Sequence, residues 1–168
     1  YPNLSTNQIS DFKYFFRNDY DNKNFKLVNW YPGVRKGLEI FATSGKFESI
    51  NVITNKPTKP TIALLNNAKL DLYFNNIYGV DYKLYRQIST KSFTNKGEAI
   101  KFALQIQKIK TNNAVYIGDT NSDLLASKEN NIQFIAVNYG FYLWKDSEIS
   151  KADYIISNFN GLHNLFFE

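Results

Sequence analysis

The chain has 168 residues, 43% of them hydrophobic, and its 20 lysine and arginine residues outnumber its 15 aspartate and glutamate residues, for a net charge of +5. This length suits one domain, and the hydrophobic content excludes a disordered chain. The absence of cysteine and the single histidine, His163, exclude disulfides, zinc–thiolate sites and centres built from several histidines. The positive charge suits an anionic substrate or a nucleic acid, but it is scattered, and a mildly basic soluble domain is the simpler interpretation.

The first thirty residues differ from the rest of the chain. Apolar side chains recur there at helical spacing, at Ile9, Phe12, Phe15, Phe16 and Tyr20. This period predicts an amphipathic helix over residues 7–21. We interpret its aromatic stripe as a packing surface rather than a binding site.

The N-terminus carries no targeting signal that the sequence reveals. The first residues lack the charged-then-apolar pattern of a signal peptide, and we expect a cytoplasmic protein. Every apolar run is shorter than the roughly 20 residues that a membrane-spanning helix needs. Methionine is absent from the chain, so Tyr1 is not a translation start and we expect the native protein to be longer.

The remaining chain alternates short apolar runs with segments of helical periodicity. The predicted strands cover residues 49–53, 74–80, 114–117, 134–137 and 154–156. The predicted helices cover residues 34–41, 57–68, 96–108, 122–128 and a C-terminal segment from Gly161, with Pro57 in the first turn of the second. This alternation predicts an α/β fold, an open parallel sheet with helices on both faces. Such sheets bind ligands at the carboxyl ends of their strands.

The predicted strand 49–53 is followed by Thr54 and Asn55. The Thr54 hydroxyl and the free N–H groups of the following helix could together bind a phosphate oxygen. Alternatively, Thr54 or Asn55 caps that helix, and taken alone the pattern favours the cap.

Two carboxylates, Asp119 and Asp123, follow the strand that ends at Gly118. Four residues apart on a strand-to-helix turn, they can face one small volume, and like charges so close call for a cation. Magnesium fits best, because it prefers oxygen ligands and often bridges to a substrate phosphate. The alternative is a capped turn that leaves Asp123 on the helix surface.

Lys96 opens the predicted helix 96–108. A lysine is unfavourable at the N-terminus of a helix, because the positive end of the helix dipole repels it. A phosphate partner would explain the position, although a solvated lysine is the simpler interpretation for this residue alone.

Taken in order, these segments resemble the haloacid dehalogenase-like superfamily, in its phosphoglycolate-phosphatase-like branch. Residues 52–57 look like its second motif, residues 96–100 like its third and residues 115–123 like its fourth. Residues 31–34 are similar to the segment that returns from a helical cap into the core, and residues 152–156 resemble the closing strand.

The resemblance implies a Rossmann-type core and a particular division of the chain. Residues 1–29 would be the end of a helical cap domain, and residues 30–168 the core without its first strand. The first motif of the family, an apolar strand ending in Asp-x-Asp-x-Thr, is not found here. Asp19 and Asp21 lack the following glycine and threonine, and we expect them to be surface residues. The nucleophile is therefore expected upstream of this chain.

The activity implied is that of a magnesium-dependent phosphatase acting on a small phosphomonoester, phosphoglycolate-like or a sugar phosphate, through an aspartyl-phosphate intermediate. By resemblance, Asp119 and Asp123 would hold Mg²⁺. Thr54 and Lys96 would be catalytic, and together with Asn55 they would bind the substrate.

A second hypothesis is a catalytically inactive member that binds a phosphorylated ligand or a protein partner. The absence of the nucleophile motif would favour it if Tyr1 lay near the start of the mature protein. No basic helix with interleaved aromatic residues supports nucleic-acid binding, and no membrane partner is expected. The sequence does not indicate an oligomeric state.

Overall fold

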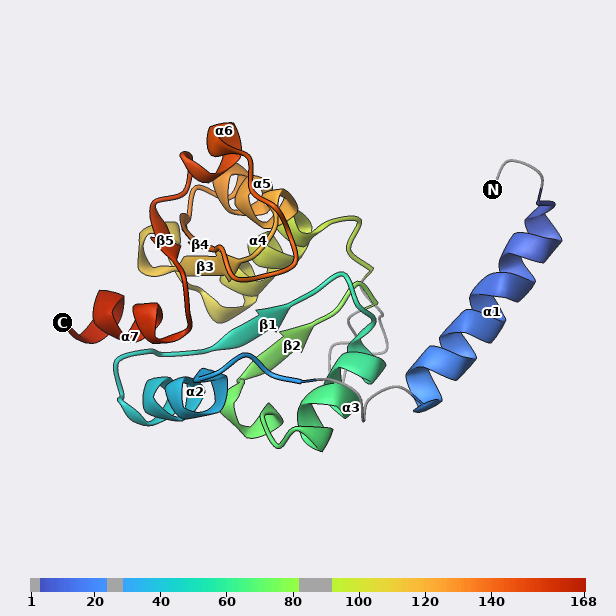
Figure 1. Ribbon diagram of the computed structural model, residues 1–168, viewed down its shortest axis with the longest axis horizontal. Coiled ribbons are helices and arrows are strands. Elements are labelled where there is room, and N and C mark those ends of the chain that lie inside the picture. Colours follow the sequence, from blue (N-terminus) through green and yellow to red (C-terminus); the bar gives the residue numbers. More distant parts are fainter. Residues whose placement is uncertain (1–3, 24–28, 82–91) are drawn as a thin grey trace.

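The computed structural model describes residues 4–23, 29–81 and 92–168. In that part of the chain helices alternate with short strands (Figure 1). The strands are β1 (Asn51–Ile53), β2 (Asn76–Tyr78), β3 (Val115–Gly118), β4 (Gln133–Val137) and β5 (Tyr154–Ile156). The helices are α1 (Thr6–Lys23), α2 (Val34–Thr43), α3 (Thr58–Asn67), α4 (Lys96–Gln107), α5 (Asn121–Glu129), α6 (Asp146–Ile149) and α7 (Asn160–Phe167).

All strand pairs among the described residues are parallel, as the alternating pattern predicts, but their ladders form two groups. β1 pairs with β2, with Val52 opposite Ile77. β4 pairs with β3 on one side and β5 on the other, with Ile117 opposite Ile135. No ladder joins β1 to β3 within the described residues, so the expected single sheet is divided between these two strands.

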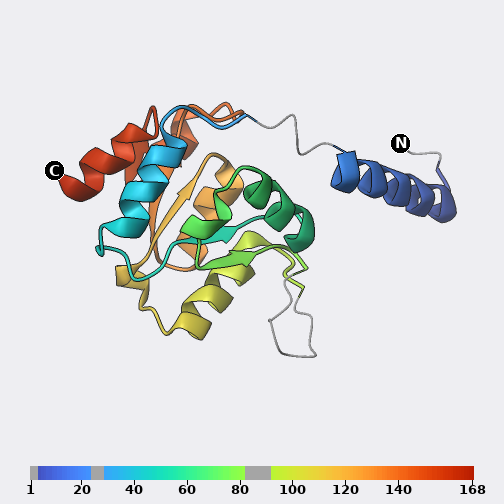
Figure 2. The ribbon, with the colours of Figure 1, turned by 90° about the horizontal axis from the view of Figure 1, so that it is seen from below.

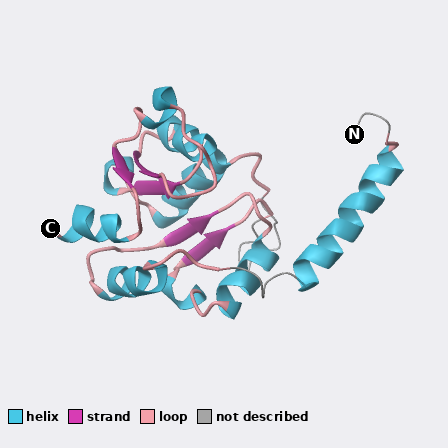
Figure 3. Ribbon diagram, in the orientation of Figure 1, coloured by secondary structure: helices cyan, strands magenta, loops and turns pink. Residues whose placement is uncertain are grey.

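Helices cover both faces of the two strand groups (Figure 3). On one face, α2 and α3 pack against β1 and β2 through Leu38 and Leu65. On the same face, α2 and α7 pack against β4 and β5 through Phe41 and Leu162. On the opposite face, α4 and α5 pack against Ile53 and Tyr116. Successive residues of a strand point to opposite faces, so β1 and β3 share the same two helical layers. The architecture is therefore a three-layer α/β/α unit.

The predicted elements are confirmed in type, with differences at their ends. The strand expected over residues 74–80 is reduced to β2, and the one expected over 49–53 to β1. Pro57 precedes α3 in an extended conformation rather than occupying its first turn. The short helix α6 was not expected, because a single turn shows no periodicity over which a pattern could be recognised.

The predicted N-terminal helix is present as α1, which stands apart from the α/β unit in both ribbon views (Figures 1 and 2). Its aromatic stripe is exposed: Phe12 and Phe15 keep 64% and 68% of their surface accessible. Among the described residues, no contact of Phe12 or Phe15 with the α/β unit supports the packing role expected of this stripe. Asp19 is exposed on the same helix, as expected, whereas the side chains of Tyr20 and Asp21 lie outside the described part of the structure.

No helix in the described ranges is both long and apolar enough to cross a membrane. The proposed division into a cap remnant, residues 1–29, and a core, residues 30–168, stays a prediction, because residues 24–28 lie outside the described residues.

Candidate active site

The centre of the site is the buried carboxylate of Asp123, which is only 2% exposed. It accepts four hydrogen bonds: from Lys96 Nζ at 2.6 Å and Tyr116 OH at 2.9 Å on Oδ1, and from Thr120 N at 3.1 Å and Thr120 Oγ1 at 2.6 Å on Oδ2. Burial of a charge is costly unless it is paired and hydrogen-bonded, and both conditions are met here. Asp123 therefore faces inward from α5. The turn is capped, as the alternative interpretation expected, by a capping box of Thr120 and Asp123, but the surface position that it gave Asp123 is wrong.

Lys96 is the first residue of α4, as the sequence predicts, and its side chain is 16% exposed. The helix begins there because Asn95 Oδ1 accepts from Glu98 N at 2.9 Å, while Glu98 Oε2 accepts from Thr94 N at 2.9 Å. The ion pair with Asp123 offsets the unfavourable position of a lysine at a helix N-terminus.

The packing of α4 against α5 brings these two residues together. Asn130, just after α5, donates from Nδ2 to the carbonyl of Gly97 at 3.0 Å. Ile100 and Ala126 bury the apolar contact between the same helices. The ion pair of Lys96 and Asp123 thus depends on contacts between segments far apart in the sequence.

Asp119 follows β3 directly and is half-buried. A side chain at position 140 would come within 2.6 Å of Asp119 Oδ2, so the loop after β4 approaches this carboxylate closely enough to require glycine there. Gly118 meets a similar restriction, because a Cβ there would lie 2.3 Å from the Cβ of Asp123. The two carboxylates are thus held on one tight turn.

Asp119 differs from Asp123 in its partners. Among the described residues, Asp119 accepts no hydrogen bond and forms no ion pair. Its negative charge contributes to raising the pKa of Tyr139, for which burial is the main cause and Tyr31 the second. Asp119 is therefore a carboxylate with unused acceptor capacity next to a fully satisfied one.

Thr54 extends the β1–β2 pairing by one bond, from its N–H to the Tyr78 carbonyl at 3.0 Å. Its Oγ1 accepts from Lys56 N at 3.1 Å, within its own loop, so the hydroxyl hydrogen remains available to donate. Thr54 does not cap α3, because Asp81 Oδ1 accepts from Thr58 N at 2.6 Å at that helix start. Asn55 is exposed beside it.

The structure thus brings Lys96, Asp123 and Asp119 together at the carboxyl end of β3. Thr54 and Asn55 lie at the carboxyl end of β1, the same edge of the parallel unit, and no hydrogen bond joins them to the first three. Sequence reasoning missed Tyr116 and Thr120 as partners of Asp123. The position of Tyr116, two residues before Gly118 on the same strand face, was the signal available in the sequence.

The donor set fits a hard cation better than a zinc ion. The described residues contain no group of three or more His, Cys, Asp or Glu side chains able to hold a metal. Mg²⁺ is commonly held by one or two carboxylates, with water and substrate phosphate completing its coordination. Asp119 offers free carboxylate oxygens of that kind, whereas the lone pairs of Asp123 are occupied by its four donors.

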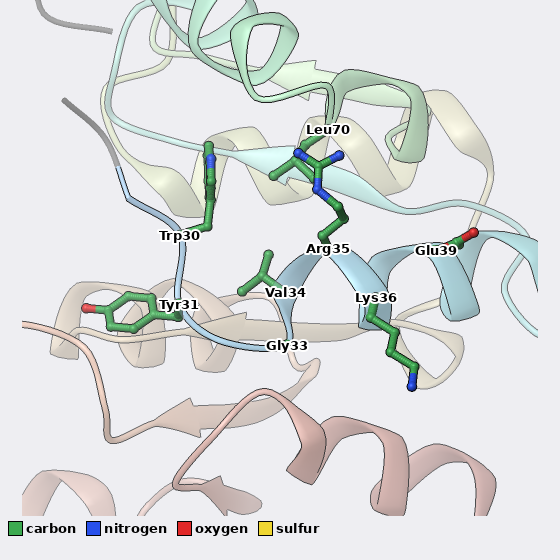
Figure 4. Close-up of a pocket in the computed structure, with 8 residues that line it drawn as sticks. All are labelled: Trp30, Tyr31, Gly33, Val34, Arg35, Lys36, Glu39 and Leu70. Carbon is green, nitrogen blue, oxygen red and sulfur yellow. The ribbon is translucent and has the colours of Figure 1, made fainter. Parts of the chain in front are cut away.

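A surface pocket of about 330 Å³ lies elsewhere, between the segment entering α2 and Leu70 (Figure 4). In the close-up the Arg35 guanidinium lies beside Leu70 and the Lys36 side chain points away. Arg35 donates to the carbonyls of Ala68 and Lys69 at the end of α3. None of the expected site residues lines this pocket; Tyr31, which does, contacts Tyr139 at 5.1 Å between ring centroids.

The sequence model of one family, "Haloacid dehalogenase-like hydrolase", matches residues 3–137. The chain is also similar to two curated phosphoglycolate phosphatases. It is 31% identical to phosphoglycolate phosphatase 1 of Pseudomonas aeruginosa over 68% of this chain and 39% of that protein. It is 25% identical to a phosphoglycolate phosphatase of Pseudomonas fluorescens over 88% of this chain and 50% of that protein. The chain thus spans half or less of these relatives.

Among solved structures, a haloacid dehalogenase-like family hydrolase from Streptococcus pneumoniae has a similar fold, with a TM-score of 0.79 and 26% sequence identity. The match covers 98% of this chain and 73% of that one.

Proposed function

Because the chain belongs to the haloacid dehalogenase-like hydrolases, we propose that it carries the phosphate-binding part of a magnesium-dependent phosphatase that hydrolyses a small phosphomonoester. The observation that carries the proposal is the contrast between two adjacent carboxylates. Asp123 is buried and forms an ion pair with Lys96, whose Nζ lies 2.6 Å from Asp123 Oδ1. The neighbouring carboxylate, Asp119, has no hydrogen-bond or ion-pair partner among the described residues. A fixed ammonium beside a free carboxylate suits a site that binds a phosphoryl group together with a cation.

In this proposal Asp119 holds Mg²⁺, and Asp123 supports the site by holding Lys96. Bound there, the cation would neutralise charge on the phosphoryl oxygens and orient them. Lys96 has three N–H donors, of which Asp123 takes one, so the others can donate to the phosphoryl group and the attacking carboxylate.

Thr54 complements this arrangement from the neighbouring strand end. Its hydroxyl donates to a phosphoryl oxygen, and the exposed Asn55 amide lines the same side of the substrate. The attacking carboxylate, which would form the aspartyl-phosphate, is assigned to a segment outside these 168 residues. Because phosphoryl transfer depends mainly on positioning and charge stabilisation, the residues assigned here would position the phosphoryl group and offset its charge.

The substrate class proposed is a small phosphorylated metabolite, phosphoglycolate-like or a sugar phosphate, acted on in the cytoplasm. The names of the relatives support the first of these.

The proposal is tested with the full-length gene product, assayed on p-nitrophenyl phosphate and 2-phosphoglycolate with and without EDTA. We expect EDTA to abolish turnover and Mg²⁺ to restore it. Asp119→Asn should lower kcat/KM by at least about 100-fold, because the amide removes the charge that attracts the cation. The matched control is Asp146→Asn, an exposed carboxylate in the first turn of α6, which should keep full activity.

Two results contradict the proposal: turnover that persists without any metal, and turnover that Asp119→Asn leaves intact. A wild-type protein that binds phosphate but hydrolyses neither substrate would instead favour an inactive, ligand-binding member of the family.

A further inference from the structure

The hydroxyl of Tyr116 shares one oxygen of Asp123 with the ammonium of Lys96. Tyr116 OH lies 2.9 Å from Asp123 Oδ1, and Lys96 Nζ lies 2.6 Å from the same atom. The other oxygen, Oδ2, is taken by the N–H and the hydroxyl of Thr120. Each carboxylate oxygen accepts about two hydrogen bonds, so Tyr116 fills the second acceptor position of Oδ1.

The aromatic ring of Tyr116 packs against the hydrophobic core. It packs against the buried cluster of Ile100 and Ala126 and against the one that contains Leu124. Its centroid lies 6.3 Å from that of Phe134. The hydroxyl is thereby held at the end of a rigid ring, whereas the lysine side chain has four rotatable carbon–carbon bonds and no ring to restrain it.

Lys96 has no other acceptor in the described part of the chain. Because Tyr116 occupies one lone pair of Oδ1, Lys96 donates to the other, and its two further N–H groups have no acceptor on Asp123. We propose that Tyr116 is a positioning residue that orients Lys96 toward the phosphoryl group by occupying the competing acceptor position on Asp123. This inference rests on the function proposed above.

The chemistry of the phenol suits this role. Burial, followed by the charge of Asp123, raises the pKa of Tyr116 well above its ordinary value. A raised pKa favours the protonated phenol, the form that donates to Asp123.

A plain structural role is the competing explanation, because a buried tyrosine hydroxyl usually finds a hydrogen-bond partner. The chain offers a matched control: Tyr142 OH donates to Glu148 Oε2 at 2.8 Å, also a phenol–carboxylate bond. Neither Tyr142 nor Glu148 has been placed in the site. Tyr142→Phe should therefore cost a hydrogen bond without changing catalysis.

The first experiment replaces Tyr116 by Phe in the full-length protein, which keeps the packed ring and removes only the hydroxyl. We expect kcat on p-nitrophenyl phosphate to fall about tenfold and KM to stay within about twofold, the size expected from losing one charge-assisted hydrogen bond. Tyr142→Phe should retain wild-type kcat. Equal kcat values for Tyr116→Phe and wild type, or a loss of the same size in Tyr142→Phe, overturn the proposal.

The second experiment reads the position of Lys96 without turnover. In protein labelled with ¹⁵N at lysine, the order parameter of the Lys96 ammonium should fall in Tyr116→Phe and stay unchanged in Tyr142→Phe. Replacing Tyr116 by p-aminophenylalanine restores a donor at the same place and should recover both the order parameter and kcat. This variant also decides the matter if Tyr116→Phe fails to fold.

The two experiments separate the two proposals. A wild-type protein without phosphatase activity refutes the proposed function, and the order parameter alone then decides whether Tyr116 positions Lys96. An unchanged Lys96 signal in Tyr116→Phe refutes the positioning role even where the phosphatase activity is present.

Discussion

The carboxyl ends of β3 and β1 both carry polar residues, but the protein holds them in different ways. After β3, Asp123 is buried and accepts four hydrogen bonds from its surroundings. After β1, Thr54 is half-buried with one local hydrogen bond to Lys56 N, and Asn55 is exposed. The polar residues at one strand end are held by the fold, and those at the other are open to a ligand.

This difference separates stability from function. A buried carboxylate with a full set of donors contributes to the folded state, because each donor would otherwise lose its partner. A hydroxyl that bonds only within its own loop contributes little to folding, so its removal should affect binding instead. The two strand ends should therefore respond to substitution in opposite ways.

The largest loss of stability is expected for Asp123→Asn. The amide keeps the shape but turns an NH₂ group toward donors, either Lys96 and Tyr116 or the two donors of Thr120. We expect the free energy of unfolding to fall by about 3 kcal/mol, as for the breaking of a buried ion pair. Urea denaturation of the full-length protein, followed by circular dichroism, measures the change.

Two variants control for this result. Asp153→Asn changes the more exposed pair of Asp153 with Lys128, at 3.0 Å, and should cost less than about 1 kcal/mol. Lys96→Met should also lower stability by more than Asp153→Asn, because it leaves the buried charge of Asp123 without its counter-ion. Similar losses in Asp123→Asn and Asp153→Asn would show that the strand end at β3 has no special role in folding.

Much of the fold followed from local patterns in the sequence. The strand preceding Asp119 is a short apolar run bounded by a polar turn, and the helix beginning at Lys96 has its capping residues beside it in the sequence. Periodicity and capping depend on neighbouring residues, so they can be recognised without the structure. The spacing of Asp119 and Asp123 likewise placed both carboxylates on one turn.

The contacts that define the site could not be predicted, because they join distant segments. The ion pair of Lys96 with Asp123 depends on how α4 packs on α5, and the hydrogen bond from Tyr116 depends on which face of β3 meets those helices. The break between β1 and β3 is also a matter of strand pairing, on which an apolar run carries no information. The same holds for the exposure of Phe12 on α1, since periodicity defines a face but not its partner.

At the end of β1 we expect a substitution to lower activity and to leave stability almost unchanged. Thr54→Val keeps the branched shape and the backbone bond to Tyr78 but removes the hydroxyl. We expect kcat/KM on p-nitrophenyl phosphate to fall about tenfold, because one donor to the phosphoryl oxygens is lost. Thermal unfolding should shift little, since the hydroxyl accepts a single local bond from Lys56 N.

Thr54→Ser is the matched control, because it retains a hydroxyl at the same place and should keep most of the activity. If Thr54→Val lowers stability as much as Asp123→Asn while leaving kcat/KM unchanged, the contrast between the two strand ends is wrong.

The smallest effect is the pH-dependent contribution of Asp153 to stability. This residue lies at the amino end of β5, away from the site. The N–H of Phe134 donates to its carboxylate at 2.8 Å, and this bond, helped by Lys128, lowers the pKa of Asp153 below its ordinary value of 3.8. Since the folded state then binds this proton less readily than the unfolded state, Asp153 stabilises the fold above that ordinary pKa. Its contribution is lost as the pH falls through the lowered value.

The difference in unfolding free energy between the wild type and Asp153→Asn should therefore be constant at neutral pH and shrink below about pH 4. Urea titrations at a series of pH values measure it, and the difference should stay under about 1 kcal/mol throughout, because the pair is partly exposed. A difference that grows as the pH falls would reverse the sign of the argument. Asp153→Asn would then no longer serve as the control for the loss of stability in Asp123→Asn.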